Sequence, residues 1–410
     1  MRVLVVGAGG VGTAVVRTIA RRDFFDALVI ADRDETRAEA AAGSVADPRV
    51  SSAGVDASDA RSVEDLARRT GATHVLNAVD PRFVLPVFEG TLAADADYLD
   101  MAMSLSRPHP ERPHELPGVK LGDEQFAQAA RWEDAGRLAL VGIGVEPGLS
   151  DVFARYAADH LFSEIDELGT RDGANLVVDG YDFAPSFSIW TTIEECLNPP
   201  VIWTADRGWH TTAPFSEPEV FDFPGGIGPV ECVHVEHEEV LLMPRWVTAR
   251  RVTFKYGLGA EFIGVLRTLH TLGLDRTDPV TVRTPAGPAV VSPRDVVAAC
   301  LPDPAQLGDR MHGTTCAGLL VTGTGRDGRP REVYLHHLVD NAWSMAEYGS
   351  QCVVWQTAVN PVVALELLAE GTWSGAGVLG PEAFDPVPFL DRLGTYGPSW
   401  QLQERTPAEA

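Results

Sequence analysis

The sequence predicts an α/β fold in which a doubly wound parallel sheet is followed by a separate α+β domain with a mixed sheet. Three observations support this prediction. Short apolar runs alternate with helical segments over residues 1–155, and a glycine-rich turn follows the first of these runs. From about residue 165, strand-like stretches alternate with Gly/Pro turns instead. At 410 residues the chain is also too long for one compact core.

The first apolar run leads into a turn with the pattern Gly-x-Gly-x-x-Gly. A side chain at Gly7 would obstruct the bend, Gly9 lets the backbone approach a pyrophosphate, and Gly12 lets a helix pack closely on the strand. Gly10 and Val11 open that helix, whose free N–H groups would face the phosphates. The pattern is typical of a Rossmann-type dinucleotide site.

The second apolar run, residues 27–31, ends at Asp32, twenty positions after the last glycine of the turn. A carboxylate there accepts hydrogen bonds from both ribose hydroxyls of an adenosine. Asp32 favours NAD, because it would repel a 2′-phosphate, whereas the neighbouring Arg33 leaves NADP possible. Asp56 ends the third strand and could approach the adenine edge, with a local turn role equally open.

Four further strands complete the first sheet. They are expected over residues 49–55, 73–79, 98–102 and 137–141, with helices over 35–42, 60–70, 83–95 and 122–135. Ligands of such sheets lie beyond the carboxyl ends of the strands. Asn77 and Ala78 would therefore lie near the nicotinamide or its ribose, although Asn77 could instead bond its own turn. Gly144, Glu146 and Pro147, after the last strand, would lie at the reacting centre.

The overall charge and cysteine usage limit the partners. A net charge of −25 argues against nucleic acid and anionic membranes. The five cysteines are scattered without a Cys-x-x-Cys pair, which predicts reduced thiols in the cytoplasm and no zinc site. No apolar run approaches membrane-spanning length, and the chain starts directly with strand residues, leaving no room for a signal peptide.

The second domain carries acidic and aromatic residues close together. Trp190, Glu194 and Glu195 lie within six positions, and carboxylates beside an aromatic face form a receptacle for ammonium groups. The alternative is that acids are simply abundant in so acidic a chain. His234 to Glu239 reads as a half-exposed strand, and no metal is expected there because no third ligand stands at a diagnostic spacing.

Several motifs together resemble the saccharopine dehydrogenase superfamily, which includes saccharopine reductase, lysine 6-dehydrogenase, carboxynorspermidine dehydrogenase and homospermidine synthase. The motifs are the glycine turn, Asn77-Ala-Val, Tyr98-Leu-Asp100, Gly142-x-Gly-x-x-Pro-Gly148, Gly349-Ser-Gln351 and Phe384-Asp-Pro-x-Pro-Phe-Leu390. They cover the first 155 residues and roughly the last 65 well, and the middle only loosely.

The resemblance implies a division into domains. Residues 1–155 would form the Rossmann domain, 156–345 a substrate and dimerisation domain, and 346–402 a segment that returns to the Rossmann domain. The polar tail 403–410 is expected to be disordered. The family also implies a homodimer and hydride transfer to or from a carbon that bears nitrogen.

The predicted function is that of an NAD(P)-dependent oxidoreductase acting on a C–N bond of an amino acid or amine. Saccharopine-type chemistry comes first, followed by a lysine 6-dehydrogenase or a polyamine-forming reductase. A homospermidine synthase-like transferase that retains NAD, and a non-catalytic dinucleotide sensor, remain as alternatives. Both would lack net redox turnover.

Candidate residues for the chemistry follow from the same resemblance. Tyr98, Asp100 and Glu195 are candidates for orienting the amine or moving its proton. Lys255 stands where some relatives have an Arg-Tyr pair, and could hold a substrate carboxylate or be a solvated lysine. Ile143 occupies a position where relatives that handle saccharopine often have Cys, so a thiol role is absent there.

Overall fold

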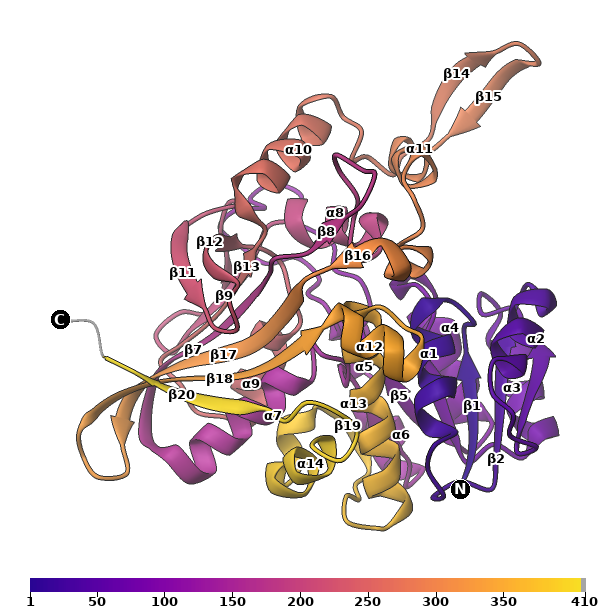
Figure 1. Ribbon diagram of the computed structural model, residues 1–410, viewed down its shortest axis with the longest axis horizontal. Helices are drawn as coiled ribbons and strands as arrows, with labels where there is room; N and C mark the ends of the chain where they lie inside the picture. The colour runs from indigo at the N-terminus through magenta and orange to yellow at the C-terminus, as the bar shows by residue number, and fades with distance from the viewer. Residues whose placement is uncertain (407–410) are drawn as a thin grey trace.

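The computed structural model describes residues 1–406 and contains two large sheets (Figure 1). The first is a seven-stranded sheet with the order β19-β6-β5-β4-β1-β2-β3, in which every pairing is parallel. Its strands are β1 (Arg2–Val6), β2 (Ala27–Asp32), β3 (Val50–Gly54), β4 (His74–Asn77), β5 (Asp97–Asp100), β6 (Leu138–Leu140) and β19 (Gly377–Leu379). The predicted doubly wound parallel sheet is confirmed.

The strand order reverses between β1 and β4, which is where ligands of such sheets bind. Val6 at the end of β1 is in register with Ala31 of β2 on one side and Asn77 of β4 on the other. The ends of these three strands therefore meet at one edge. This register places the glycine turn beside Asn77.

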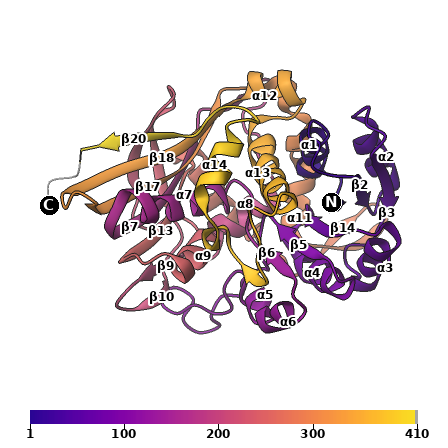
Figure 2. The ribbon, with the colours of Figure 1, turned by 90° about the horizontal axis from the view of Figure 1, so that it is seen from below.

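Helices cover both faces of this sheet (Figure 2). On one face α1 (Gly10–Ile19) packs with α2 (Glu35–Gly43) and α13 (Cys352–Ala369), and on the other α3 (Ala60–Thr70) packs with α4 (Val84–Ala93). The single helix expected over 122–135 is instead two short ones, α5 (Asp123–Phe126) and α6 (Ala129–Asp134). The buried Gln125 side chain anchors the first of them, because it bonds both Asp100 and the Ser104 N–H.

The second sheet is mixed, as predicted, and has nine strands. Only β13 and β7 pair in parallel. Its strands are β7 (Phe162–Ala174), β9 (Val201–Thr204), β10 (Gly208–Thr211), β11 (Glu219–Phe223), β12 (Gly228–His234), β13 (Arg251–Gly257), β17 (Thr314–Gly325), β18 (Pro330–Asp340) and β20 (Gln401–Arg405). Strands β17 and β18 form a long antiparallel hairpin that turns over residues 326–329.

Further elements surround the second sheet. They are α7 (Leu149–Tyr156), β8 (Val177–Val178), α8 (Ile189–Leu197), α9 (Glu239–Trp246), α10 (Gly259–Thr271), α11 (Pro293–Cys300), β16 (Met311–His312) and α12 (Asn341–Tyr348). The hairpin of β14 (Val280–Thr284) and β15 (Gly287–Val291) projects from this domain and pairs with neither large sheet (Figure 1).

The C-terminal segment contacts both sheets. Its strand β19 pairs with β6, and α13 and α14 (Pro386–Leu393) pack together. Strand β20 instead pairs with β18 of the second sheet, so the prediction of disorder is wrong for residues 403–405. Backbone groups of an open edge strand accept a partner strand whatever its side chains, which polarity does not reveal. Residues 407–410 of that predicted tail lie outside the described residues.

One helix corrects the statement that no segment has membrane-spanning length. α13 has 18 residues and is apolar enough to qualify by length and composition. Most of it is buried, however, against α1, α12 and α14. It is therefore a core helix of this fold.

Candidate active site

The glycine turn has the geometry that a bound dinucleotide requires. Gly7 has φ of +109°, and a Cβ there would lie 2.5 Å from the Ala78 carbonyl oxygen. A Cβ at Gly12 would collide with the Gly7 carbonyl oxygen. At Gly9 the nearest atom to such a Cβ is an Arg37 guanidinium nitrogen at 3.7 Å, so the space above this residue is open. The turn thus fits a dinucleotide.

Asp32 lies at the end of β2, where it was expected, and also closes the turn. One carboxylate oxygen accepts a hydrogen bond from Ala8 N–H at 2.8 Å and the other from Asp34 N–H at 3.0 Å. Arg33 is exposed beside it. Asp56 accepts hydrogen bonds from the Ser58 N–H and Oγ at 3.0 and 2.6 Å, and these bonds lower its pKa. These bonds give Asp56 the local turn role that was open in the sequence.

A cavity of about 650 Å³ joins the edge of the first sheet to the second domain. Val11, Asn77 and Ala78 line it on the dinucleotide side, and Glu146 and Pro147 line it further along, as expected. The second domain contributes Asp172, Thr191, Glu195, His237, Glu238, Phe254 and Tyr256. Glu195 is the one residue of this last group that was expected to face a substrate. The others come from β7, α8, the loop before α9 and β13, which only the tertiary structure brings together.

The cavity is strongly acidic. Seven carboxyl groups line it, and one of them, Asp80, is already paired with Arg82 outside the lining: Asp80, Glu146, Asp172, Asp182, Glu195, Glu238 and Glu261. Among the lining residues that the structure describes there is no Lys or Arg, and His237 is the one basic side chain. Such a lining attracts cations and repels anions.

His237 carries a positive charge at neutral pH. Its ring stacks on Phe254 with centroids 3.9 Å apart, and Nδ1 lies 2.5 Å from a Glu239 carboxylate oxygen. Burial by itself would lower the pKa of His237, but the charge of Glu239 and its hydrogen bond raise it to about 10. The imidazolium and Glu239 form an ion pair behind the cavity wall.

Three of the cavity carboxyl groups, those of Glu146, Asp172 and Glu195, have raised pKa values in the absence of a facing cation. Burial raises the pKa of Glu195 to about 8, and burial together with the charge of Glu239 raises that of Asp172 to about 8. Burial also raises the pKa of Glu146 well above its usual value. A cationic ligand would reverse these shifts, because an adjacent positive charge favours the ionised carboxylate.

The segment around His237 is not the half-exposed strand that was expected. Strand β12 ends at His234, the following residues form a buried loop, and α9 begins at Glu239. Donor atoms of His237, Glu238 and Glu239 lie within 4.8 Å of one another, a spacing that a metal ion could use. The short contact between His237 and Glu239 shows that these two groups already satisfy each other. The prediction of a half-exposed strand from the period-two alternation is wrong because tertiary packing buries both sides of the segment.

Tyr98 and Asp100 are not in the cavity, which corrects their proposed catalytic role. The Asp100 carboxylate is 1% exposed and accepts hydrogen bonds from Gly142 N–H at 2.6 Å and Gln125 Nε2 at 2.8 Å. The Tyr98 hydroxyl accepts one from Asn77 Nδ2 at 3.0 Å. Both residues stand on the same side of β5, under the covering helices, so they position the strand ends and cannot reach a substrate.

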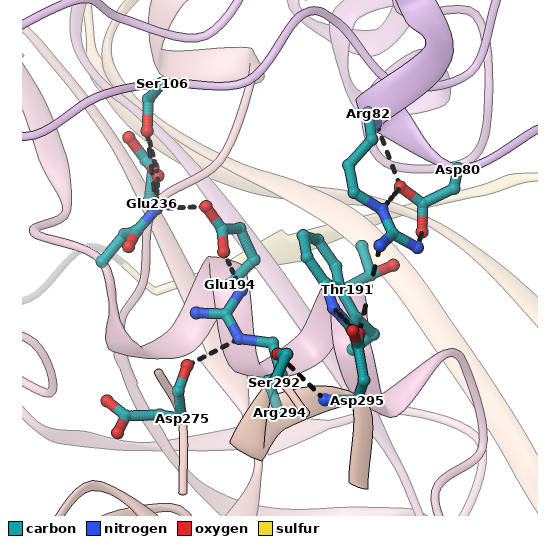
Figure 3. Close-up of polar contacts among 12 residues, drawn as sticks. Asp80, Arg82, Ser106, Thr191, Glu194, Glu236, Asp275, Ser292, Arg294 and Asp295 are labelled. Atoms are coloured by element: carbon teal, nitrogen blue, oxygen red, sulfur yellow. Dashed lines mark hydrogen bonds and ion pairs between the residues drawn. The ribbon is translucent and has the colours of Figure 1, made fainter. Parts of the chain in front are cut away.

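Trp190 and Glu194 also lie outside the cavity. Figure 3 shows Glu194 beside Arg294, and Arg82 beside Asp80 and Asp295. The guanidinium groups of Arg82 and Arg294 lie over the Trp190 ring, 4.5 and 4.8 Å from its centroid, and Trp190 Nε1 donates to Asp295 at 3.1 Å. Glu194 forms an ion pair with Arg294. Protein cations already occupy the aromatic and acidic groups that were expected to hold a substrate ammonium. This cluster instead ties the loop after β4 to α8 and α11.

Lys255 and Gly144 also do not face a substrate as was expected of them. The Lys255 ammonium is buried and lies 2.7 Å from a Glu219 carboxylate oxygen, on the opposite side of β13 from the cavity-lining Phe254 and Tyr256. It has a carboxylate partner within the protein and does not face a substrate. Gly144 supports the cavity wall from behind, since its N–H donates to the Pro147 carbonyl at 2.6 Å.

Comparison with known proteins is consistent with this architecture. Residues 3–140 match the saccharopine dehydrogenase NADP-binding domain, and residues 144–397 match the saccharopine dehydrogenase C-terminal domain. In fold, the chain is similar to apo saccharopine dehydrogenase (L-Glu forming) from Saccharomyces cerevisiae, with a TM-score of 0.70 and 15% identity over 99% of this chain and all of that one.

Two curated relatives match along nearly their whole length. Carboxyaminopropylagmatine dehydrogenase of Synechocystis sp. is 31% identical over 402 residues, covering 97% of this chain and 96% of the relative. Carboxynorspermidine synthase of Vibrio alginolyticus is 29% identical over 420 residues, covering 100% and 98%. The chain therefore belongs to the saccharopine dehydrogenase family and is an NAD(P)-dependent oxidoreductase that acts on a C–N bond.

Proposed function

We propose that the protein reduces the imine formed between a carbonyl compound and a primary amine that carries a second cationic group, as in a polyamine. The observation that carries this proposal is the cavity lined by seven carboxyl groups and, within the described residues, by no Lys or Arg. A substrate with two positive charges can pair with several of these groups. The names of the relatives, which refer to agmatine and norspermidine, support the same class.

The charge of the cavity argues against the saccharopine-type substrate that ranked first on sequence grounds. A substrate with several carboxylates needs fixed cations, and Arg is the usual bidentate partner. The residue considered for that task, Lys255, is paired with Glu219. The polyamine-forming alternative therefore takes first place.

The residues have distinct tasks in this proposal. The nicotinamide, when bound, supplies the hydride. Asn77 and Ala78 border the place where the glycine turn and the cavity meet, and would hold the cofactor end. Glu195 on α8 and Asp172 on β7 would pair with the ammonium groups and so orient the C–N bond. His237 would balance the charge of the acidic wall through Glu239.

We also propose NADP(H) as the preferred cofactor. Both carboxylate oxygens of Asp32 accept hydrogen bonds from backbone N–H groups of the turn. Arg33 is exposed next to it, and Arg37 reaches over Gly9. Two guanidinium groups at this edge can accommodate a 2′-phosphate. The match to an NADP-binding domain supports this preference.

The homodimer and the cytoplasmic location stay proposals. All five cysteines are free, and four of them are buried, which agrees with a reducing compartment. Light scattering after size-exclusion chromatography tests the dimer, and cell fractionation tests the location.

The deciding experiment follows the absorbance of reduced nicotinamide with purified protein. Diaminopropane, putrescine and agmatine, each with an aldehyde, are compared with lysine and saccharopine, using NADPH and NADH in turn. We expect oxidation of NADPH with a diamine or agmatine. Turnover of saccharopine but of no diamine would contradict the proposal. Exchange of amines without net nicotinamide oxidation would instead assign the homospermidine synthase-like chemistry.

A further inference from the structure

We propose that a segment of the second domain, from α11 to the short helix η3 (Pro304–Gln306), forms the outer wall of the dinucleotide site and slows release of the cofactor. The match to an NADP-binding domain ends at residue 140, so this assigns part of the cofactor site to residues 293–306. The inference rests on the nicotinamide cofactor and not on the amine that the enzyme uses.

The segment lies against the glycine turn. A Cβ built on Gly10 would be 3.0 Å from the Ala305 Cβ, so η3 packs against the first residue of α1. Gly9 before it has open space above, and Val11 after it lines the cavity. The phosphates of a dinucleotide lie along such a turn, at the helix N-terminus. A dinucleotide that reaches from Asp32 into the cavity therefore passes beside Ala305.

Buried contacts hold η3 in this place. Leu307 and Gly308, which follow it, are buried. Asn341 Nδ2 donates to the Gly308 carbonyl at 2.9 Å, and Asn341 Oδ1 accepts from the Cys352 N–H at 3.1 Å. Cys352 is the first residue of α13, and α13 packs on α1. The end of the segment is thus tied to the helix that begins at the glycine turn.

The other end of the segment contacts the loop after β4 (Figure 3). Asp295 on α11 lies 4.0 Å from Arg82 Nη1 and accepts a hydrogen bond from Trp190 Nε1, and the Arg82 guanidinium lies over the Trp190 ring. Arg82 also holds Asp80, with contacts of 2.8 and 3.1 Å to its two carboxylate oxygens. Asp80 lines the cavity together with Ala78. Through Arg82, α11 therefore contacts the loop that borders the cofactor end of the cavity.

The two contacts lie on either side of the switch point of the first sheet. Gly10 follows β1 and Arg82 follows β4, and the strand order reverses between these strands. Dinucleotides of doubly wound sheets bind in the crevice at this point. Contacts made only for domain packing could fall anywhere along the boundary between the domains, whereas both of these flank the cofactor crevice.

The contacts are weak enough to open. The side chains of Arg82 and Asp295 are 44% and 56% exposed, and exposed ion pairs contribute little to stability. Ala305 is exposed as well, and its side chain is a single methyl group. The segment can therefore move away when the cofactor enters or leaves, and it delays release while it is closed.

Opposite charges at residue 305 test the position of the segment. Ala305→Glu and Ala305→Lys add long side chains to an exposed residue, so they share the steric effect and differ in charge. Kd for reduced nicotinamide nucleotide, NADPH or NADH, is measured by fluorescence titration. We expect Kd for Ala305→Glu to be about tenfold or more above that for Ala305→Lys at low salt, and the ratio to shrink as salt is added.

Ala286→Glu and Ala286→Lys are the matched controls. They make the same charge changes at the turn of the projecting β14–β15 hairpin (Figure 1), and Ala286 is also exposed. We expect their Kd values to differ by less than about twofold. A ratio for the Ala305 variants no larger than that for the Ala286 variants would overturn the placement of η3 at the dinucleotide.

A second test measures release of the cofactor. Asp295→Ala removes the contact of α11 with Arg82. Asp278→Ala is its control, because it removes an exposed acid of the same domain that is paired with Arg276. Dissociation is followed by stopped-flow fluorescence as excess oxidised nucleotide displaces the reduced form. We expect Asp295→Ala to release the cofactor about fivefold faster than wild type, and Asp278→Ala to match wild type.

The outcomes separate this inference from the proposed function. Unchanged release from Asp295→Ala would overturn the retaining role, and slower release would overturn it by showing that the segment obstructs the site. Neither measurement uses an amine. Lack of imine reduction by the wild-type enzyme would therefore overturn the proposed function without affecting either result.

Discussion

Glu195→Gln is the substitution whose effects the structure predicts most fully. Glu195 faces the cavity from α8, and burial raises its pKa to about 8. In the free enzyme at pH 7 a carboxyl group with this pKa is about one-tenth ionised, and at pH 9 about nine-tenths. Binding an ammonium group against it requires ionisation, which costs about 1.4 kcal/mol at pH 7 and nearly nothing at pH 9. The affinity for the amine should therefore rise roughly tenfold over this interval.

The glutamine variant should remove both the ion pair and its pH dependence. Loss of one partner of a buried ion pair costs about 3 kcal/mol, so KM for the amine should rise roughly a hundredfold at pH 9. The difference between variant and wild type should narrow toward pH 7. Glu194→Gln is the matched control. The Glu194 carboxylate neighbours Glu195 in sequence but is paired with Arg294 and lies outside the cavity.

The pH dependence of folding stability provides an independent check. Stability should fall as the pH rises, whereas the affinity for the amine should increase. Because the folded pKa of Glu195 is raised from 4.5 to about 8, the stability that its proton contributes is complete below pH 4.5 and is lost as the pH rises to about 8. The shift corresponds to about 5 kcal/mol. Wild type should thus lose stability relative to Glu195→Gln between pH 5 and pH 8.

The assays are amine KM against pH and thermal unfolding against pH, for wild type and both variants. A KM for Glu195→Gln within twofold of wild type across the whole range would refute the placement of the substrate ammonium at this carboxylate. Parallel unfolding curves for wild type and Glu195→Gln would refute the raised pKa.

Three further predictions concern the cofactor side and the domain contact. Gly12→Ala should abolish nicotinamide binding in fluorescence titrations and cost about 1–3 kcal/mol in unfolding experiments, because the new Cβ would meet the Gly7 carbonyl. Arg37→Ala should raise KM for NADPH about tenfold or more, as expected for a lost charge-assisted phosphate contact, and leave KM for NADH nearly unchanged; equal effects would assign Arg37 to the pyrophosphate. Arg82→Ala should lower the free energy of unfolding by about 1 kcal/mol, because its cation–π contact with Trp190 is lost. Denaturant unfolding measures this loss. When Trp190→Ala is added to Arg82→Ala, the free energy of unfolding should not fall a second time on account of that contact.

Local sequence signals located the cofactor half of the site well. The glycine turn, Asp32 and Asn77 follow strands that the alternation of apolar runs predicts to be parallel, and each lies at the carboxyl end of its strand. These signals succeed because steric demands at Gly7 and Gly12 act between near neighbours or adjacent strands.

The substrate half could not be located in the same way. Trp190, Glu194 and Lys255 have the right chemistry, but Arg82, Arg294 and Glu219 already occupy them. All of these contacts join residues at least 36 positions apart in the chain. Packing decides which charged side chains already have a partner within the protein.

The sequence by itself determined the fold class, the family, the dinucleotide turn and six of the seven strands of the first sheet, because these depend on backbone sterics and hydrophobic periodicity over short spans. Only the tertiary structure decided that Tyr98 and Asp100 lie behind the site, while Asp172 and His237 lie in it. It also decided that β20 leaves the first domain to complete the second sheet. These outcomes depend on which side chains share a desolvated space, and burial and charge then act between residues that the chain order keeps apart.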